Sequence, residues 1–318
     1  MTAAGALPLL PAGARAAAET PASIPAPSYP PIIGEIETYV TRYEDTLVDL
    51  ARTHGLGYTE MVTANPGIDP WVPGADVEIT LPKAHILPSV ERKGLVLNLA
   101  DQRLYHFMPD GTSVDTAPLG IGDEGWDTPQ GETKVVRKKH RPTWYVPKSI
   151  REQDPELPAY IRPGPQNPLG EHALYLGWPA YLIHGTNKPL GVGRRVSHGC
   201  VRLYPEDIAR MFATVPVGTP VRVIDQEVKL ARMDGQLWLE VHPNPDQVHE
   251  VEQTGTLSPS KPPEFEYQVV TAAGNDQHRI DWDMAQKAAM ERRGMPVPIL
   301  IPASDSEPET TETAAQKN

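Results

Sequence analysis

Cys200 is the only cysteine in the 318 residues, and it stands in a stretch that also holds two histidines. Residues 184–202 read HGTNKPLGVGRRVSHGCVR, so His184 precedes the cysteine by sixteen positions and His198 precedes it by two. A thiol attacks a carbonyl as its thiolate, and an adjacent imidazolium favours that form. The spacing therefore predicts a cysteine nucleophile paired with a histidine.

The backbone around Cys200 is suited to acyl transfer. Gly191, Gly193 and Gly199 allow one stretch of backbone to approach another closely. The N–H groups of Gly199 and Cys200 precede a predicted short helix at 205–212, which suits stabilisation of an oxyanion. Nucleophile, base and oxyanion donors then share one segment, as reaction through a thioester requires.

Two other interpretations of the cysteine are open. A single cysteine is often a small buried apolar residue, but Ser197, His198 and Arg202 beside it are polar and costly to bury. A zinc ion bound by His184, His198 and Cys200 is also chemically plausible, because thiolate and imidazole ligands suit that ion.

Length, charge and hydropathy limit the possible classes of protein. A chain of 318 residues suggests two or three units with their own cores. The 29 basic and 41 acidic residues give a formal charge of -12, which argues against nucleic acid or anionic lipid as a partner. No window of about 18 uninterrupted apolar residues exists, so we expect no transmembrane span.

The N-terminus resembles the end of a secretory signal. It reads MTAAGALPLLPAGARAAAETPAS, with small residues suited to cleavage near 14–16, and an Ala/Pro-rich stretch follows over 17–36. We assign 1–36 as a signal-like segment and linker, with a disordered Ala/Pro leader as the alternative.

The next 47 positions, 37–83, predict a small strand–helix–helix–strand unit. Leu47, Leu50 and Ala51 recur at helical spacing, and Asp45 is placed to cap the first helix. Trp71 is interpreted as a core aromatic residue, with a ring that stacks on a ligand as the alternative.

A larger unit over 93–243 is rich in strand signals, including a hairpin around Asp234-Gly235, and predicts a mainly β fold with α+β elements. Its proline-dense segment 137–173 predicts a long loop over the sheet. A C-terminal extension follows over 244–301 with one helix near its end, and 302–318 predicts a disordered acidic tail.

The motifs of the larger unit resemble a known family. HGT followed by SHGCVRL resembles the signature of L,D-transpeptidases with a YkuD-type catalytic domain. Four further segments are similar to the ErfK/YbiS-like branch of this family, which is found in Gram-negative envelopes. They are IGDEGWDTPQGETKV, RPTWYVP, GPQNPLG and YLIHGTN. The resemblance implies a YkuD-type β-sandwich catalytic domain over 93–243, with 137–173 as a capping loop over the substrate groove.

The resemblance also assigns roles to seven residues. It makes Cys200 the nucleophile and His184 the general base, and it gives Gly185 a backbone carbonyl that orients the imidazole. The other four positions, which lie beside the oxyanion site or complete the motif, are His198, Gly199, Ser197 and Arg202.

The reaction implied by the resemblance needs neither a cofactor nor a metal. Cys200 attacks the carbonyl of the third residue of a peptidoglycan tetrapeptide stem, D-Ala leaves, and an amine resolves the thioester. The amine belongs either to another stem, which gives a 3-3 crosslink, or to a lysine of an outer-membrane lipoprotein. Water as acceptor would make the enzyme a carboxypeptidase. The implied location is the periplasm, after export.

Residues 38–83 separately resemble a LysM module, a βααβ fold that binds N-acetylglucosamine-containing glycan. The support comes from Tyr39-Val40, Asp45-Thr46-Leu47, Ala51, Asn65-Pro66, Gly74 and Ile79-Thr80-Leu81-Pro82. A unit that only spaces the catalytic domain from its surroundings is the alternative. A second hypothesis for the whole chain is a non-catalytic protein that binds the cell wall through this module.

Overall fold

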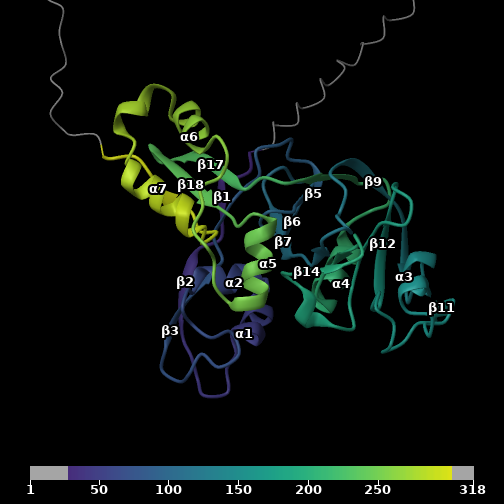
Figure 1. Cartoon of the computed structure of the whole chain (residues 1–318). Helices are drawn as coiled ribbons and strands as arrows, with labels where there is room; N and C mark the ends of the chain where they lie inside the picture. The colour runs from purple at the N-terminus through teal and green to yellow at the C-terminus, as the bar shows by residue number, and fades with distance from the viewer. Residues whose placement is uncertain (1–27, 303–318) are drawn as a thin grey trace, which may run out of the picture.

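The computed structural model describes residues 28–302, and its elements form three adjoining units (Figure 1). The predicted cleavage site and nearly all of the predicted acidic tail lie outside the described residues. No helix within the described range has the length and hydropathy to cross a membrane.

Ordered structure begins earlier than predicted. β1 (Ile32–Ile33) lies inside the segment assigned as linker and pairs antiparallel with β4 (His85–Ile86). The assignment of 1–36 as linker is therefore wrong for its last residues, because β4 offers them backbone hydrogen-bond partners that composition does not reveal.

The N-terminal unit has the predicted strand–helix–helix–strand order. Its elements are β2 (Ile36–Val40), α1 (Leu47–Thr53), α2 (Tyr58–Ala64) and β3 (Glu78–Pro82). β2 and β3 pair antiparallel, and the predicted apolar positions Leu47, Leu50 and Ala51 pack in its core with Met61 and Ile79. The βααβ order is present, while the identification as LysM stays a prediction.

Two local predictions in this unit are wrong. The helix cap is Thr46, whose side chain accepts from the Asp49 backbone N–H, because Asp45 instead accepts from Tyr39 and from backbone. Trp71 is 50% exposed, since it lies in a turn whose backbone N–H groups are bound by Asp69.

The central unit is built on one eight-stranded sheet in the order β15-β13-β12-β9-β16-β5-β6-β7. Its strands are β5 (Gly94–Asn98), β6 (Arg103–Phe107), β7 (Val114–Pro118), β9 (Gly131–His140), β12 (His172–Leu176), β13 (Leu182–His184), β15 (Val201–Arg202) and β16 (Pro220–Ile224). The pairs β13–β15 and β5–β16 are parallel, and the other pairs are antiparallel. The mainly β class is confirmed. These eight strands form one continuous ladder, and a separate two-stranded sheet pairs β8 (Ile121–Gly122) in parallel with β14 (Arg195–Ser197).

The core lies on one face of this sheet. α4 (Pro205–Thr214), the predicted short helix, buries Ile208 and Met211 against that face. Strand residues whose side chains join this core include Leu174, Ile183 and Val201. Because side chains alternate along a strand, their sequence neighbours point to the opposite face.

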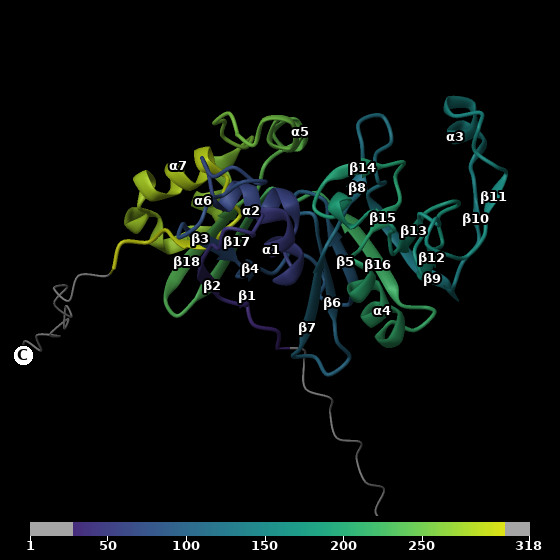
Figure 2. The same cartoon turned by 90° about the horizontal axis from the view of Figure 1, so that it is seen from below.

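The proline-dense segment 137–173 contains short elements that the prediction of a loop did not include. β9 continues to His140, and the remainder holds a hairpin and a helix, β10 (Trp144–Tyr145), α3 (Lys148–Gln153) and β11 (Tyr160–Ile161). This lobe projects from one end of the molecule (Figure 2).

The C-terminal unit includes a hairpin that the sequence assigned to the catalytic domain. Its elements are β17 (Val228–Met233), β18 (Gln236–Val241), α5 (Pro245–Thr254), α6 (Phe265–Ala273), η2 (Gly274–Arg279), α7 (Trp282–Glu291) and β19 (Val297–Pro298). The Asp234-Gly235 turn is present, with φ of 51° and 74°. β18 pairs with β19, and the hairpin shares a core with α6 and α7. The boundary at 243 is therefore wrong, because the partners of the hairpin come later in the chain.

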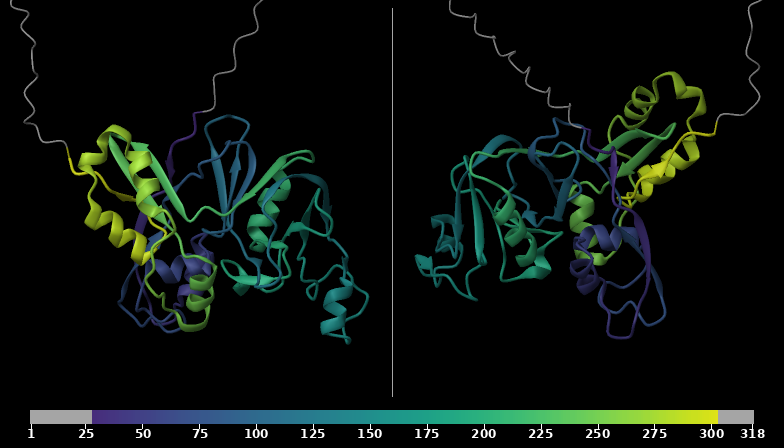
Figure 3. Two further views of the ribbon diagram at one scale, coloured as in Figure 1. Left: turned by 45° about the horizontal axis from the view of Figure 1, so that its top comes forward. Right: turned by 180° about the vertical axis from the view of Figure 1, so that it is seen from behind.

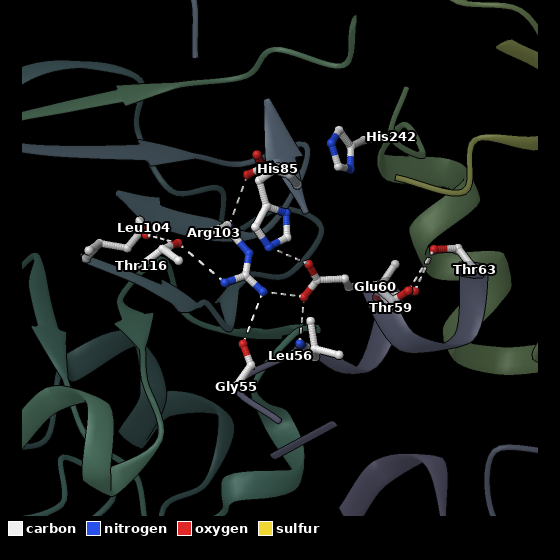
Figure 4. A network of polar contacts seen from close by, with 12 residues as sticks. Gly55, Leu56, Thr59, Glu60, Thr63, His85, Arg103, Leu104, Thr116 and His242 are labelled. Atoms are coloured by element: carbon white, nitrogen blue, oxygen red, sulfur yellow. Dashed lines mark hydrogen bonds and ion pairs between the residues drawn. The ribbon is translucent and has the colours of Figure 1, made fainter. Parts of the chain in front are cut away.

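A buried ion pair joins the N-terminal unit to the central sheet (Figure 4). The guanidinium of Arg103, on β6, donates to Glu60 of α2 at 2.6 Å and to the Gly55 carbonyl at 3.2 Å. His85 lies on the other oxygen of Glu60, with its Nε2 at 3.6 Å. The side chain of Arg103 is 2% exposed, so little water screens the pair.

A second buried cluster joins the central sheet to the C-terminal hairpin. Lys229 Nζ donates to Asp101 at 2.8 Å, to Glu240 at 2.6 Å and to the Tyr105 hydroxyl at 3.1 Å. Burial alone would lower the pKa of Lys229, but the two carboxylates outweigh it and raise that pKa. Asp101, Glu240 and His242 have ligand atoms close enough to suit a metal ion, yet the charged ammonium already neutralises these carboxylates.

We expect Arg103→Met to lower the free energy of unfolding by about 3–5 kcal/mol, because it leaves Glu60 buried without its cation. Urea denaturation checks this. Arg52→Met removes an exposed pair with Glu206 at the same interface and should cost about 1 kcal/mol or less. If both variants lost the same free energy of unfolding, the buried pair would contribute no more to stability than the exposed pair.

Candidate active site

The parallel pair β13–β15 places the predicted nucleophile and base on one face. Ile183 is paired with Val201, and both side chains lie in the core. His184 and Cys200, their sequence neighbours, therefore point to the opposite face on adjacent strands. Cys200 stands two positions before Arg202, the residue paired with His184, so the two side chains are diagonal to each other across this pair.

The sulfur of Cys200 lies at the start of β13. It donates a hydrogen bond to the Ala180 carbonyl at 3.5 Å, and it is also hydrogen-bonded to the Leu182 backbone. Cys200 is partly accessible to solvent. The thiol is thus neither sealed in the core nor freely exposed.

The imidazole of His184 is held in one tautomer. Its Nδ1 lies 2.6 Å from the backbone carbonyl of Gly185, which can only accept, so Nδ1 carries the proton and Nε2 is left as a base. Gly185 suits this position because a Cβ there would lie 3.0 Å from Ile208 of α4. The carbonyl contact expected of Gly185 is present.

The charge state of the pair differs from the predicted imidazolium and thiolate. Burial, followed by the positive charge of Arg202, lowers the pKa of His184 to about 4, although the Gly185 carbonyl opposes this. Burial also raises the pKa of the Cys200 thiol, outweighing the Leu182 hydrogen bond and Arg202. Near neutral pH the site therefore holds a neutral thiol and a neutral imidazole.

Side chains from two segments hold the loop that carries Cys200. Ser197 is buried and its hydroxyl donates to the Cys200 carbonyl at 2.5 Å. Thr128 donates to the Gly199 carbonyl at 3.1 Å. Gly199 has φ of +89°, and a Cβ there would lie 2.9 Å from the ring of Tyr181, so only glycine fits without strain.

The oxyanion donors were expected just ahead of a helix. Instead β15 separates Cys200 from α4, because Val201 and Arg202 pair with β13. The N–H groups of Gly199 and Cys200 therefore belong to a loop that leads into a strand.

His198 points away from the other two residues of the zinc alternative. It is exposed, its ring lies 4.7 Å from that of Trp126, and Nε2 is 3.4 Å from Gln153 of the 137–173 segment. The geometry does not gather the ligand atoms of His184, His198 and Cys200 into a group that could hold a metal ion within the described residues.

The N-terminal unit contacts the loop between His184 and Cys200. Thr59 donates to the Gly193 carbonyl through both its backbone N–H, at 3.0 Å, and its hydroxyl, at 2.8 Å. The guanidinium of Arg194 lies 3.5 Å from the ring centroid of Tyr58. At Gly193, φ is +76° and a Cβ would lie 2.1 Å from the Tyr58 nitrogen. The loop and α2 are therefore in backbone contact.

The C-terminal unit completes this support through α5. Glu252 accepts from the Arg195 backbone N–H at 2.6 Å. Val251 packs with Tyr58 and Val62 of α2. Figure 3 shows α5 beside the N-terminal unit. Both flanking units therefore contact the loop between His184 and Cys200.

Sequence reasoning did not identify Thr128, Thr59 or Glu252. Thr128 lies within the quoted phrase IGDEGWDTPQGETKV, so the motif was an available signal. Thr59 and Glu252 belong to other units, and no pattern in the sequence connects them with the loop.

This chain is similar to several known proteins. The L,D-transpeptidase catalytic domain model, YkuD, matches residues 92–223. "Probable L,D-transpeptidase ErfK/SrfK" of Escherichia coli K12 is 42% identical over 259 residues, covering 80% of this chain and 82% of that protein. "Probable L,D-transpeptidase YbiS" of the same organism is 41% identical, covering 78% and 81%. The NMR structure of the catalytic domain from the E. faecium L,D-transpeptidase aligns with 43% of this chain and 100% of that domain, at 23% identity and a TM-score of 0.34.

We expect Gly193→Ala to destabilise the protein by about 3 kcal/mol or more, because it adds a steric clash with α2 to the strain of a positive φ. Gly218→Ala is the matched control, since its φ is +96° but nothing lies within 4 Å of the added Cβ, and it should cost about 1–2 kcal/mol. Denaturant unfolding measures both. Indistinguishable costs would contradict the close contact.

The neutral pair predicts a pH dependence for alkylation of Cys200 by iodoacetamide. Since the thiolate reacts and burial raises the thiol pKa, the rate should rise about tenfold per pH unit from pH 6 to 9. Mass spectrometry follows the adduct, with N-acetylcysteine as a parallel control. A rate independent of pH between about 5 and 8 would instead indicate an imidazolium–thiolate pair.

Proposed function

Because this chain belongs to the L,D-transpeptidase family with a YkuD-type catalytic domain, we propose that Cys200 carries a peptidoglycan stem as a thioester and passes it to an amine. The cell-wall L,D-transpeptidase activity follows from the family, and the proposal concerns the residues that perform it. The observation that carries it is the Nδ1 contact of His184 with Gly185, which leaves Nε2 as a base on the face that Cys200 shares.

The proton movements follow from the neutral pair. His184 Nε2 takes the thiol proton as the sulfur attacks the carbonyl carbon of the third stem residue, usually meso-diaminopimelate. The tetrahedral intermediate collapses with cleavage of the bond to D-Ala, whose nitrogen takes the proton from the imidazolium. The acceptor amine then attacks the thioester and gives a proton to His184, and the thiol is restored as the sulfur leaves.

The remaining predicted residues act around this pair. Gly199 and Cys200 offer loop N–H groups to the oxyanion, and Ser197 fixes that loop through the Cys200 carbonyl. Burial and then the charge of Arg202 lower the pKa of His184, so the imidazole is neutral before the reaction and its Nε2 carries a lone pair. His198, which is exposed and lies beside Trp126, would act next to the oxyanion site.

The proposal extends to the partners and the location of the protein. The acceptor amine comes from a second stem, giving a 3-3 crosslink, and a lipoprotein lysine or water are the alternatives. The N-terminal unit would bind glycan as a LysM module, and the 137–173 segment would cap the groove. Export to the periplasm would bring the enzyme to these substrates. The chemistry of Cys200 and His184 makes a purely wall-binding role the less favoured alternative.

Incubation with disaccharide tetrapeptide should release D-Ala and leave an acyl adduct on Cys200, both visible by mass spectrometry. His184→Ala should slow the release by about 10²–10⁴-fold, because it removes the general base. His278→Ala is the control, an exposed histidine of η2 far along the chain from the site, and should match the parent. Glycan binding without adduct or D-Ala release would overturn the proposed function.

A further inference from the structure

The sheet face that carries Cys200 continues across two more strands to β9. Leu182 is paired with Tyr175, and Tyr175 is paired with Arg137. His184 is paired with Ala173 in the next row, and Ala173 is paired with Lys139. Directly paired residues point to the same face, so Arg137 and Lys139 share the face of the thiol.

The charges on β9 alternate between the two faces. Lys138 points to the core side, where its Nζ donates to the Val215 carbonyl at 2.7 Å and lies 4.7 Å from the ring centroid of Phe212. Arg137 and Lys139 are both exposed. They are therefore the cations of this part of β9 that a molecule lying on the active-site face would contact.

Arg137 is held in place without a carboxylate partner. Its guanidinium lies 3.7 Å from the ring centroid of Tyr175, which positions it beside the row that leads to Cys200. Among the ion pairs of the described residues, none includes Arg137 or Lys139, whereas the nearby Glu171 pairs with His140 and Arg141. An acidic chain with a formal charge of -12 thus leaves two cations without an ion pair on the sheet face that also carries its thiol.

The separation suits an extended peptide. Three strand spacings lie between β15 and β9, or about 14 Å between the backbones of Cys200 and Arg137. The Arg137 guanidinium, however, lies over the Tyr175 ring of β12, two strand spacings from β15, or about 10 Å. An extended chain advances about 3.3–3.6 Å per residue, so the three stem residues up to the reacting carbonyl span this distance. A stem peptide that reacts at the sulfur can therefore place a second group at this guanidinium.

We propose that Arg137 and Lys139 form a binding subsite for a free carboxylate of the stem peptide. Guanidinium and ammonium groups bind carboxylates through charge-assisted hydrogen bonds, and the ring of Tyr175 restricts the guanidinium in advance of binding. This inference rests on the proposed function, because it takes the substrate to be a peptidoglycan stem. The same chemistry could serve the stem that acylates Cys200 or the stem that accepts the acyl group.

The test measures binding without turnover. In a Cys200→Ser background, Arg137→Gln with Lys139→Gln should weaken binding of the stem tetrapeptide about tenfold or more by calorimetry, as loss of a hydrogen bond to a charged group predicts. The same peptide with its carboxylates amidated should bind the variant and its background equally. Lys261→Gln with Lys287→Gln, two exposed lysines of the C-terminal unit, removes the same two positive charges and controls for the change in net charge.

Equal affinities for the Arg137→Gln, Lys139→Gln variant and the Lys261→Gln, Lys287→Gln control would overturn the subsite, whether or not the protein is a transpeptidase. Failure of the otherwise unchanged protein to release D-Ala would instead overturn the proposed function. The double substitution is then made in the protein that retains Cys200. If it raises the KM for D-Ala release measured without acceptor amine, the bound carboxylate belongs to the donor stem. If the double substitution slows only the transfer of the acyl group to the amine, the bound carboxylate belongs to the acceptor stem.

Discussion

Two buried cations fix the three units of this protein against one another. Arg103 of the central sheet pairs with Glu60 of the N-terminal unit. Lys229 of the C-terminal hairpin pairs with Asp101, in the turn between β5 and β6. Removing either partner of such a pair leaves an uncompensated charge in a medium of low dielectric constant, which costs far more than the loss of a surface pair. The relative placement of the units is therefore tightly specified.

This placement matters because the loop that carries Cys200 makes much of its contact outside the central sheet. α2 approaches it at Gly193 with no room for a side chain, and α5 contributes Glu252. The reactive pair has its own local support in the Nδ1 contact of His184. The thiol is thus oriented by neighbours in the strand and by two units that are remote in the chain.

The chemistry of the site could be predicted from the sequence because it depends on residues close together in the chain. His184 and Gly185 are adjacent, and Ser197 lies three positions from Cys200. The supports could not be predicted, since Thr59 and Glu252 are separated from their partners by 134 and 57 positions. The βααβ order was readable from local periodicity, whereas the place of the β17–β18 hairpin depends on β19, near the end of the described chain.

The contact of Glu252 with the Arg195 backbone has a consequence for the timing of enzyme maturation. A nascent chain emerges N-terminus first, so Cys200 and His184 leave the ribosome or a translocation channel before α5 does. Until α5 packs against the loop that carries Cys200, this loop lacks the contact with Glu252 and has only the contacts with α2. The complete set of contacts around the loop therefore requires the chain as far as the C-terminal end of α5.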